Sequence, residues 1–396
     1  MEYSSINKIN CQLGTERSVI REIFEYGNMR ASQVGRENVF DFSLGNPAVR
    51  TPKCIDDSII RLVSDSNFNV HGYTSAQGAF EVRRSIAKSI SDRFSVNAAA
   101  DDIYVTCGAA ASLTITLNAL CNSGDRVIAF APYFPEYKVF SNGAGAEFES
   151  VEADTEKFQI NFEGFEKALT PNTKAVIVNS PNNPSGAVLT EKTIIRMCEM
   201  LREYSKRFKH PIYIISDEPY RELVYDGIDV AYIPKYYDDT IVCYSYSKSL
   251  SLAGERIGYI FVSPKVNNAK EVYAAICGAG RKLGFVCAPA LMQYAISENP
   301  GCVCDISQYK LNRDLLYGAL TEYGYSCVHP DGAFYLFVKS PVADAVSFCE
   351  LAKKYDLLLV PSDSFGCKGY MRVSYCVDTD MIRRALPLFK KLIDNL

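Results

Sequence analysis

The chain has 396 residues, of which 48% are hydrophobic and 22% charged, a composition typical of a globular protein of about two domains. A formal net charge of −4 argues against a nucleic-acid partner, and no apolar run is long enough to span a bilayer. The first residues, MEYSSINKIN, lack the features of a secretory signal. The 14 cysteines are scattered, often in apolar runs, and there are three histidines, so we expect reduced thiols in a cytoplasmic protein rather than disulfides or a zinc site.

Helical periodicity appears at residues 16–30 and 80–94, and short β-rich runs follow it. Several of these runs are apolar on consecutive residues, which is typical of strands buried on both faces of a parallel sheet. The sequence therefore predicts an α/β fold with a mostly parallel sheet flanked by helices. The expected strands are 103–107, 126–130, 174–180, 212–216, 240–245 and 257–262, with a long helix at 191–209.

The pattern changes again after about residue 300. Helices are predicted at 307–323, 342–355 and 379–395, with strands in AFYLFV, LLLVP and YMRVSYC. This is typical of a smaller α+β domain. We therefore predict a large domain at 41–299, a small domain at 300–396, and an N-terminal segment at 1–40 that packs with the small domain.

Ligands of parallel sheets bind beyond the carboxyl ends of the strands, so the residues that follow each strand are candidates for a site. Gly108, Ala109 and Ala110 follow the first strand and open a helix, whose N-terminus could hold an anion. Close packing of helix on sheet explains these small residues equally simply. The loop NSPNNPSG follows the third strand and contains Asn183, although a plain turn would have the same composition.

Asp217 and Tyr220 follow the fourth strand, where the carboxylate is either functional or a helix N-cap. Ser245, Ser247 and Lys248 follow the fifth strand, and a lone lysine there could be a surface residue. Taken together, these groups suit pyridoxal phosphate. The helix N-terminus would take the phosphate, the carboxylate would pair with the ring nitrogen, the tyrosine and amide would bond to the ring hydroxyl, and the lysine would form the Schiff base.

The chain resembles the class I pyridoxal-phosphate-dependent aminotransferases of fold type I, the aspartate aminotransferase superfamily. The matched motifs span residues 43–374 in the family's order. The most specific of them is S-x-S-K followed by G-x-R-x-G, which stands at 245–248 and 254–258. This resemblance implies that Lys248 bonds covalently to the cofactor, and that Ser245 and Arg256 bind its phosphate.

Further motifs extend the resemblance, and each implies a role for a residue of this chain. Around the cofactor ring, Asn183 in NPSG would contact the ring hydroxyl, Phe134 in APYFPEY would stack on the ring, and Asp217 and Tyr220 match D-x-x-Y. Around the phosphate, Gly108, Ala109 and Ala110 match the small-residue loop, and Tyr73 in GYTSAQG would reach the phosphate of a neighbouring subunit. At the substrate, Gly45 in LGNP would lie nearby and Arg372 in MRVSY would bind the α-carboxylate. The role of Tyr73 implies a homodimer with shared sites. Arg372 alone would be explained by a surface strand, although its guanidinium suits a carboxylate.

The resemblance implies transfer of an amino group from an L-amino acid to a 2-oxo acid by a ping-pong mechanism, with Lys248 carrying the proton. Aspartate or a broad, aromatic-leaning range is expected as donor. Arg281 and Lys282 could supply a second cation for aspartate, or form a solvated helix end.

Two alternatives remain. A C–S β-lyase would have the same fold and cofactor contacts. A non-catalytic pyridoxal-phosphate-binding regulator would need an added DNA-binding domain, whereas only about 40 residues precede FSLGNP.

Overall fold

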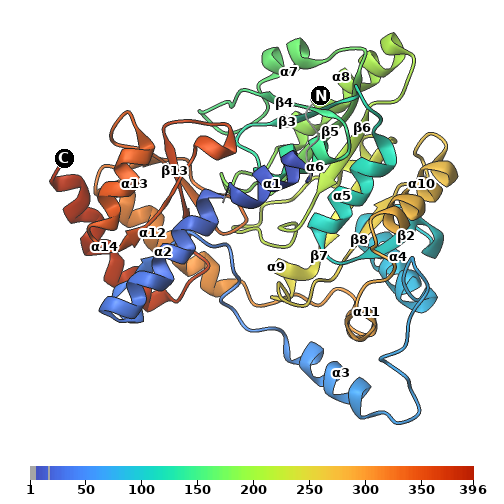
Figure 1. Cartoon of the computed structure of the whole chain (residues 1–396), viewed down its shortest axis with the longest axis horizontal. Coiled ribbons are helices and arrows are strands. Elements are labelled where there is room, and N and C mark those ends of the chain that lie inside the picture. Colours follow the sequence, from blue (N-terminus) through green and yellow to red (C-terminus); the bar gives the residue numbers. More distant parts are fainter. Residues whose placement is uncertain (1–5, 17) are drawn as a thin grey trace.

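A seven-stranded sheet forms the centre of the larger part of the molecule in this computed structural model, which describes residues 6–16 and 18–396 (Figure 1). Its strand order is β2-β8-β7-β6-β5-β3-β4. Neighbouring strands run parallel, except that β8 is antiparallel to both β2 and β7. The strands are β2 (Ile103–Thr106), β3 (Arg126–Phe130), β4 (Glu147–Val151), β5 (Thr173–Asn179), β6 (Tyr213–Asp217), β7 (Thr240–Ser245) and β8 (Gly258–Val262). The predicted α/β fold with a mostly parallel sheet is confirmed.

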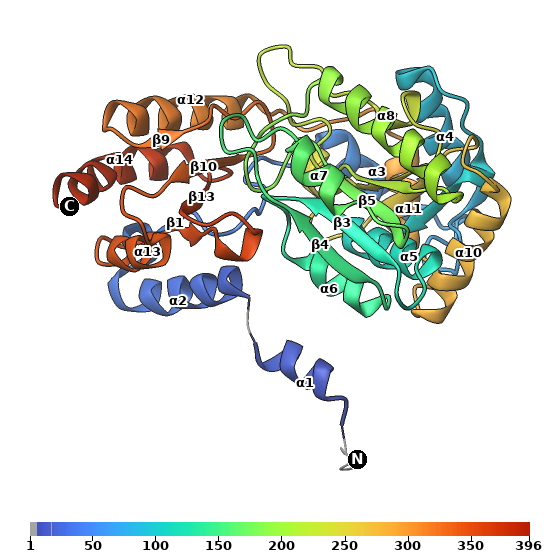
Figure 2. The same ribbon diagram turned by 90° about the horizontal axis from the view of Figure 1, so that it is seen from above.

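Helices cover both faces of this sheet, which explains why its central strands are apolar on consecutive residues. On one face, Ile177 and Ile215 lie in a core with α5 (Ala109–Leu120) and α10 (Ala269–Lys282). On the other face, Val176, Val178 and Ile214 pack with α7 (Phe162–Ala168) and α8 (Glu191–Phe208), and Figure 2 shows α5 and α8 on opposite sides. The remaining helices here are α3 (Lys53–Ser64), α4 (Phe80–Phe94), α6 (Glu136–Gly143), α9 (Tyr246–Ser249) and α11 (Ala290–Ser297).

The C-terminal part is a four-stranded antiparallel sheet with helices packed on it, in the order β12-β13-β10-β9. Phe334, Leu336 and Val373 lie in its core, which helices on both sides complete. Its elements are β9 (Ser326–Cys327), β10 (Tyr335–Lys339), β12 (Val360–Pro361), β13 (Tyr370–Ser374), α12 (Ser307–Glu322), α13 (Ala345–Lys353) and α14 (Thr379–Asp394). The predicted helices at 307–323, 342–355 and 379–395 are thereby confirmed.

The N-terminal residues contact this C-terminal part. The strand β1 (Phe40–Asp41) pairs in parallel with β11 (Leu357–Leu358). The helix predicted at 16–30 is found as α2 (Val19–Val34), whose Arg30 Nε donates to Asp356 Oδ1 at 2.6 Å. By contrast, α1 (Lys8–Thr15) stands away from the body in Figure 2. Residues 1–5 and 17 of the predicted N-terminal segment lie outside the described residues, and the domain boundaries at 40 and 299 stay a prediction.

Short 3-10 helices complete the secondary structure: η1 (Arg36–Asn38), η2 (Ala100–Asp102), η3 (Ile233–Lys235) and η4 (Asp363–Phe365). Among the residues that the structure describes, no helix combines the length and the apolar character needed to cross a membrane.

The contact between β8 and the loop before α5 depends on Gly258. This glycine pairs with Ser245 of β7, so it lies beside the carboxyl end of that strand. A Cβ atom at Gly258 would lie 2.3 Å from the carbonyl oxygen of Tyr244 and 3.0 Å from the Cα of Gly108. Both are backbone atoms, which cannot rotate away as a side chain can. The absence of a side chain at Gly258 therefore sets how closely the Gly108 loop approaches β7.

We predict that Gly258→Ala destabilises the protein by about 1–3 kcal/mol, the usual range for overpacking a tight contact. The control is Gly254→Ala, because a Cβ there would meet nothing within 4 Å. The control should change stability by no more than about 0.5 kcal/mol. The free energy of unfolding from urea titrations checks this, and equal effects of the two substitutions would contradict the packing argument.

Candidate active site

A cavity of about 300 Å³ lies at the carboxyl ends of β5, β6 and β7 and reaches β13 of the C-terminal part. The predicted site residues that line it are Gly45, Ala109, Ala110, Phe134, Asn183, Asp217, Tyr220, Ser245, Ser247, Lys248, Arg256 and Arg372. The other lining residues were not expected from the sequence: Ile20, Leu113, Asn179, Pro219, Ala253 and Tyr335. Side chains far apart in the sequence therefore converge on one cavity, as parallel strands with a common edge require.

Asp217 ends β6 and has a buried carboxylate that is only half satisfied. Its Oδ2 accepts a hydrogen bond from the hydroxyl of Tyr137 at 2.5 Å, whereas its buried Oδ1 has no partner. Burial raises the pKa of Asp217 to about 7, the Tyr137 hydrogen bond opposes that rise, and the charge of Glu218 adds to it. A carboxylate in this state needs a cationic donor at Oδ1, and the protonated nitrogen of a pyridine ring is such a donor.

Lys248 lies in α9, directly after the end of β7, and its side chain is partly buried. Its Nζ donates to the carbonyl oxygen of Gly45 at 2.6 Å. The pKa of Lys248 is lowered to about 8, chiefly by burial and also by the charges of Arg372 and Arg256, whereas Cys376 opposes the shift. An amine with this pKa is partly neutral at physiological pH, so it can act as a nucleophile and as a base.

Arg372 projects from β13 towards the large sheet, and one of its donors is free. Its two terminal nitrogens donate to Asn183 Oδ1 at 3.0 Å and to the carbonyl oxygen of Ser43 at 2.5 Å. Its guanidinium carbon lies 4.6 Å from the centre of the Tyr335 ring. The buried Nε has no partner. A planar guanidinium held in this way is suited to a carboxylate ligand.

An anion cradle lies at the N-terminus of α5, which Ala109 and Ala110 present to the cavity. Gly108 precedes them with a φ of +89°, and a Cβ atom on it would lie 2.9 Å from a terminal nitrogen of Arg256. The glycine therefore allows the guanidinium to approach the helix end. Ser245 and Ser247, whose hydroxyl oxygens are 2.7 Å apart, line the same cavity. Positive charge, helix dipole and hydroxyl groups together suit a phosphate.

Three further side chains hold the predicted ones in place. Asn179 ends β5, donates to the carbonyl oxygen of Asp217 at 2.9 Å and accepts from the backbone N–H of Asn183 at 2.8 Å. The hydroxyl groups of Tyr220 and Tyr335 lie 2.9 Å apart. Tyr137, a buried residue of α6, holds Asp217. The sequence signals for Tyr137 and Tyr335 were aromatic residues in apolar segments, which core packing explains equally well.

Other residues considered from the sequence lie outside the cavity. Tyr73 is 97% exposed and does not line it. Arg281 lies exposed in the last turn of α10, and neighbouring Lys282 donates to Asn118 Oδ1 at 3.3 Å. Neither cation is therefore placed to hold a second carboxylate in the cavity of its own subunit.

The residues present fit pyridoxal phosphate on three independent observations. The orphaned Oδ1 of Asp217 matches the ring nitrogen, the Gly108 cradle matches the phosphate, and the amine of Lys248 matches the aldehyde. The free Nε of Arg372 then remains for a substrate carboxylate.

We predict that the pH dependence of Lys248 labelling reveals its lowered pKa. In the ligand-free protein, reductive methylation of Lys248 should accelerate about tenfold per pH unit and level off above pH 8, because only the neutral amine reacts. Lys53 is the comparison, since its hydrogen bond to Asp57 raises its pKa above the ordinary value. Peptide mass spectrometry measures both rates. The same pH dependence of the methylation rate for both lysines would contradict the argument that burial lowers the pKa of Lys248.

The chain is similar to known proteins over nearly its whole length. The family model "Aminotransferase class I and II" matches residues 37–387. A probable aspartate aminotransferase of Methanocaldococcus jannaschii is 30% identical over 95% of this chain and 97% of its own length, and an aspartate aminotransferase of Thermotoga maritima is 30% identical over 91% and 92%. The crystal structure of an aminotransferase from Eubacterium rectale superposes with a TM-score of 0.97 at 53% identity over 99% of both chains. The chain belongs to the class I and II aminotransferases, which are pyridoxal-phosphate-dependent enzymes.

Proposed function

We propose that this aminotransferase takes its amino group from an aromatic L-amino acid, and that Lys248, Asp217 and Arg372 are its central residues. The main support is that these three lie around one cavity, where Asp217 Oδ1 and Arg372 Nε each lack a partner. Each of these unpartnered atoms matches one part of the reacting assembly, the cofactor ring or the substrate carboxylate.

Bound pyridoxal phosphate supplies an aldehyde that bonds to amino groups and a ring that accepts electron density from the substrate Cα. Asp217 Oδ1 would accept a hydrogen bond from the protonated ring nitrogen and so keep that nitrogen charged. Arg372 binds the substrate α-carboxylate and so fixes which Cα bond faces Lys248. The neutral Nζ of Lys248 then takes the Cα proton, a role that its pKa of about 8 allows near neutral pH. Tyr220 and Asn183 line the same cavity, and in this proposal they would bond to the ring hydroxyl.

The wall of the cavity supports an aromatic donor. Ile20, Leu113, Phe134 and Tyr335 contribute apolar and aromatic surface. Among the described lining residues, the cations are Lys248, Arg256 and Arg372, and each already has a role in the proposal. Aspartate is the second candidate, favoured by the names of the Methanocaldococcus and Thermotoga relatives. It would require a cation from another subunit for its second carboxylate.

We also propose that the enzyme is a homodimer with shared sites. Tyr73 is 97% exposed and lies outside the cavity of its own chain, which is the position expected of a residue that completes a neighbour's site. A cytoplasmic location stays a prediction from the sequence.

The half-reaction tests the proposed function. The protein loaded with pyridoxal phosphate is mixed with single amino acids without any 2-oxo acid, and the released products are quantified by mass spectrometry. An aromatic amino acid should yield about one equivalent of its 2-oxo acid per site and then stop, as a ping-pong enzyme requires. Lys248→Ala should yield none.

The other outcomes of this experiment distinguish the alternatives. Release of one equivalent from aspartate alone would replace the aromatic donor with aspartate. Continued release of pyruvate and ammonia from cystathionine would identify a C–S β-lyase instead.

Tyr137→Phe tests the role of Asp217 through cofactor binding. The substitution removes the hydrogen bond that favours ionised Asp217, so the carboxyl group holds its proton to higher pH and pairs less well with the ring nitrogen. We expect the Kd for pyridoxal phosphate to rise about tenfold at pH 7, the effect of losing one charged hydrogen bond. Tyr204→Phe removes a hydroxyl group of α8 that bonds to Glu166, and serves as the control. Equal Kd values for Tyr137→Phe and the wild type would contradict the assignment.

A further inference from the structure

We infer that Cys54 and Cys302 form a reversible dithiol–disulfide site, which a low-molecular-weight disulfide such as oxidised glutathione oxidises. The two sulfur atoms lie 2.9 Å apart although 248 residues separate them in the chain. Both side chains are partly buried. Cys304 is the cysteine nearest to Cys302 in the sequence, but the fold places Cys302 against Cys54 instead. This inference does not depend on the proposed substrate or mechanism.

Elements around the two thiols hold them together. Cys54 lies in the first turn of α3, and Cys302 lies in the loop that follows α11. The side-chain nitrogen of Asn299, in that loop, donates to Ser58 Oγ of α3 at 2.9 Å and approaches the carbonyl oxygen of Cys54 at 3.5 Å. Arg61 of α3 forms an ion pair with Glu298 at the end of α11. The approach of the thiols is therefore part of a docked interface between two helices.

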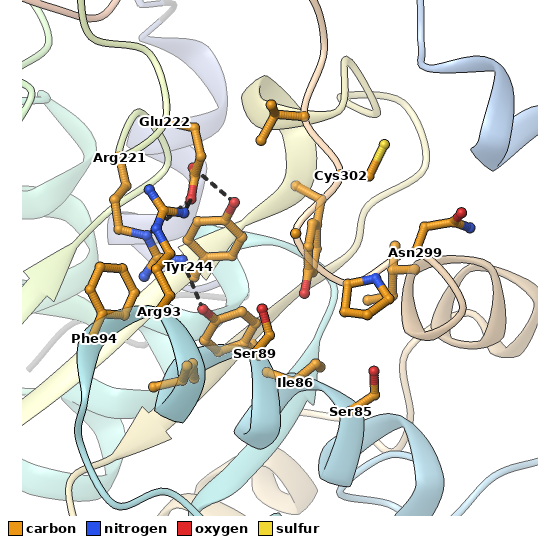
Figure 3. Close-up of a pocket in the computed structure, with 17 residues that line it drawn as sticks. Ser85, Ile86, Ser89, Arg93, Phe94, Arg221, Glu222, Tyr244, Asn299 and Cys302 are labelled. Atoms are coloured by element: carbon orange, nitrogen blue, oxygen red, sulfur yellow. Dashed lines mark hydrogen bonds and ion pairs between the residues drawn. The ribbon is translucent and has the colours of Figure 1, made fainter. Parts of the chain in front are cut away.

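The loop with Cys302 also closes a small cavity of about 40 Å³. Figure 3 shows Cys302 on the opposite side of this cavity from Arg221 and Glu222. Arg221 pairs with Glu222, and Tyr244 donates to Glu222 at 2.9 Å, so these charges satisfy one another. The causes that shift the pKa of Cys302 include burial and Cys54 but no lysine or arginine.

The two thiols react with the small disulfide one after the other. Burial raises the pKa of Cys302, followed by the effect of neighbouring Cys54, so Cys302 stays protonated until it reacts. Cys54 attacks one sulfur of the small disulfide and releases the first thiol. Cys302 then gives up its proton, attacks the Cys54 sulfur and releases the second thiol. Two protein thiols are oxidised by two electrons, and one small disulfide is reduced to two thiols.

The bond would join the two chain segments that run between the parts of the molecule. Residues 42–52 lead from β1 to α3, which has Cys54 as its second residue, and residues 298–306 lead from α11 to α12, as the blue and orange segments of Figure 1 show. Both touch the Lys248 turn. Gly45 accepts from Lys248 Nζ, and the backbone N–H of Cys304 donates to the Ser249 carbonyl oxygen at 2.7 Å. The two segments would therefore be tied next to the catalytic lysine.

Differential alkylation tests the pair. The purified holoenzyme is incubated with oxidised glutathione, free thiols are blocked, and the digest is mapped by mass spectrometry. We expect a peptide linked between Cys54 and Cys302, which dithiothreitol separates. In Cys302→Ser, Cys54 should instead keep a mixed disulfide with glutathione. Cys327→Ser is the control, since Cys327 is half-buried in β9 and should not affect the link.

Separate, singly blocked Cys54 and Cys302 peptides after oxidation would overturn the inference, as would a link from Cys302 to Cys304 or to a second copy of the chain. A second measurement checks that the bond ties the segments. The midpoint of thermal unfolding should rise on the order of 5 °C in the oxidised wild type and not in Cys302→Ser. Linked peptides without a rise in the unfolding midpoint would contradict the inference that the bond holds the two segments together.

Discussion

The buried carboxylate of Asp217 is the constraint on which the rest of the site depends. It ends a strand covered on both faces, and only one of its oxygen atoms has a partner. Because its pKa is raised in the folded protein, Asp217 binds more protons folded than unfolded between about pH 4 and 7, so its own contribution to stability falls as the pH rises through that window. A cation bonded to Oδ1 removes the destabilisation that ionised Asp217 causes. The cofactor therefore satisfies a group that the fold alone leaves unsatisfied.

The pKa of Lys248 is shifted in the opposite direction to that of Asp217, although burial is the main cause of both shifts. Burial favours the neutral amine just as it favours the neutral carboxyl group, which places both pKa values near neutrality. The parallel order of β5, β6 and β7 creates this pairing, because it brings Asn179, Asp217 and Ser245 to one edge of the sheet. Lys248 follows Ser245 by a single short turn. One strand order thus sets the positions and the charge states of both groups.

The sequence predicted the central strands because burial on both faces makes them apolar without interruption, and it predicted the cavity because polar residues follow those strands. It did not predict β4, whose residues EFESV are only partly buried at the sheet edge and show no apolar run. The antiparallel direction of β8 was also not legible, since apolar composition carries no direction. Tyr137 and Tyr335 were missed because a buried tyrosine that positions a functional group has the same local sequence as one that packs a core. Cys54 and Cys302 meet only through the docking of α3 on α11, which no local pattern encodes.

The segment at residues 43–45 connects the cavity to the rest of the molecule. Its backbone carbonyl groups accept hydrogen bonds from both cations of the site, Ser43 from Arg372 and Gly45 from Lys248. A covalent bond to Lys248 Nζ would compete with its hydrogen bond to Gly45, so cofactor binding would weaken one of the two contacts that hold this segment. The same segment leads directly into α3 and Cys54. A Cys54–Cys302 bond that restrained this segment would therefore change cofactor affinity, and cofactor binding would change the thiol equilibrium by the same factor.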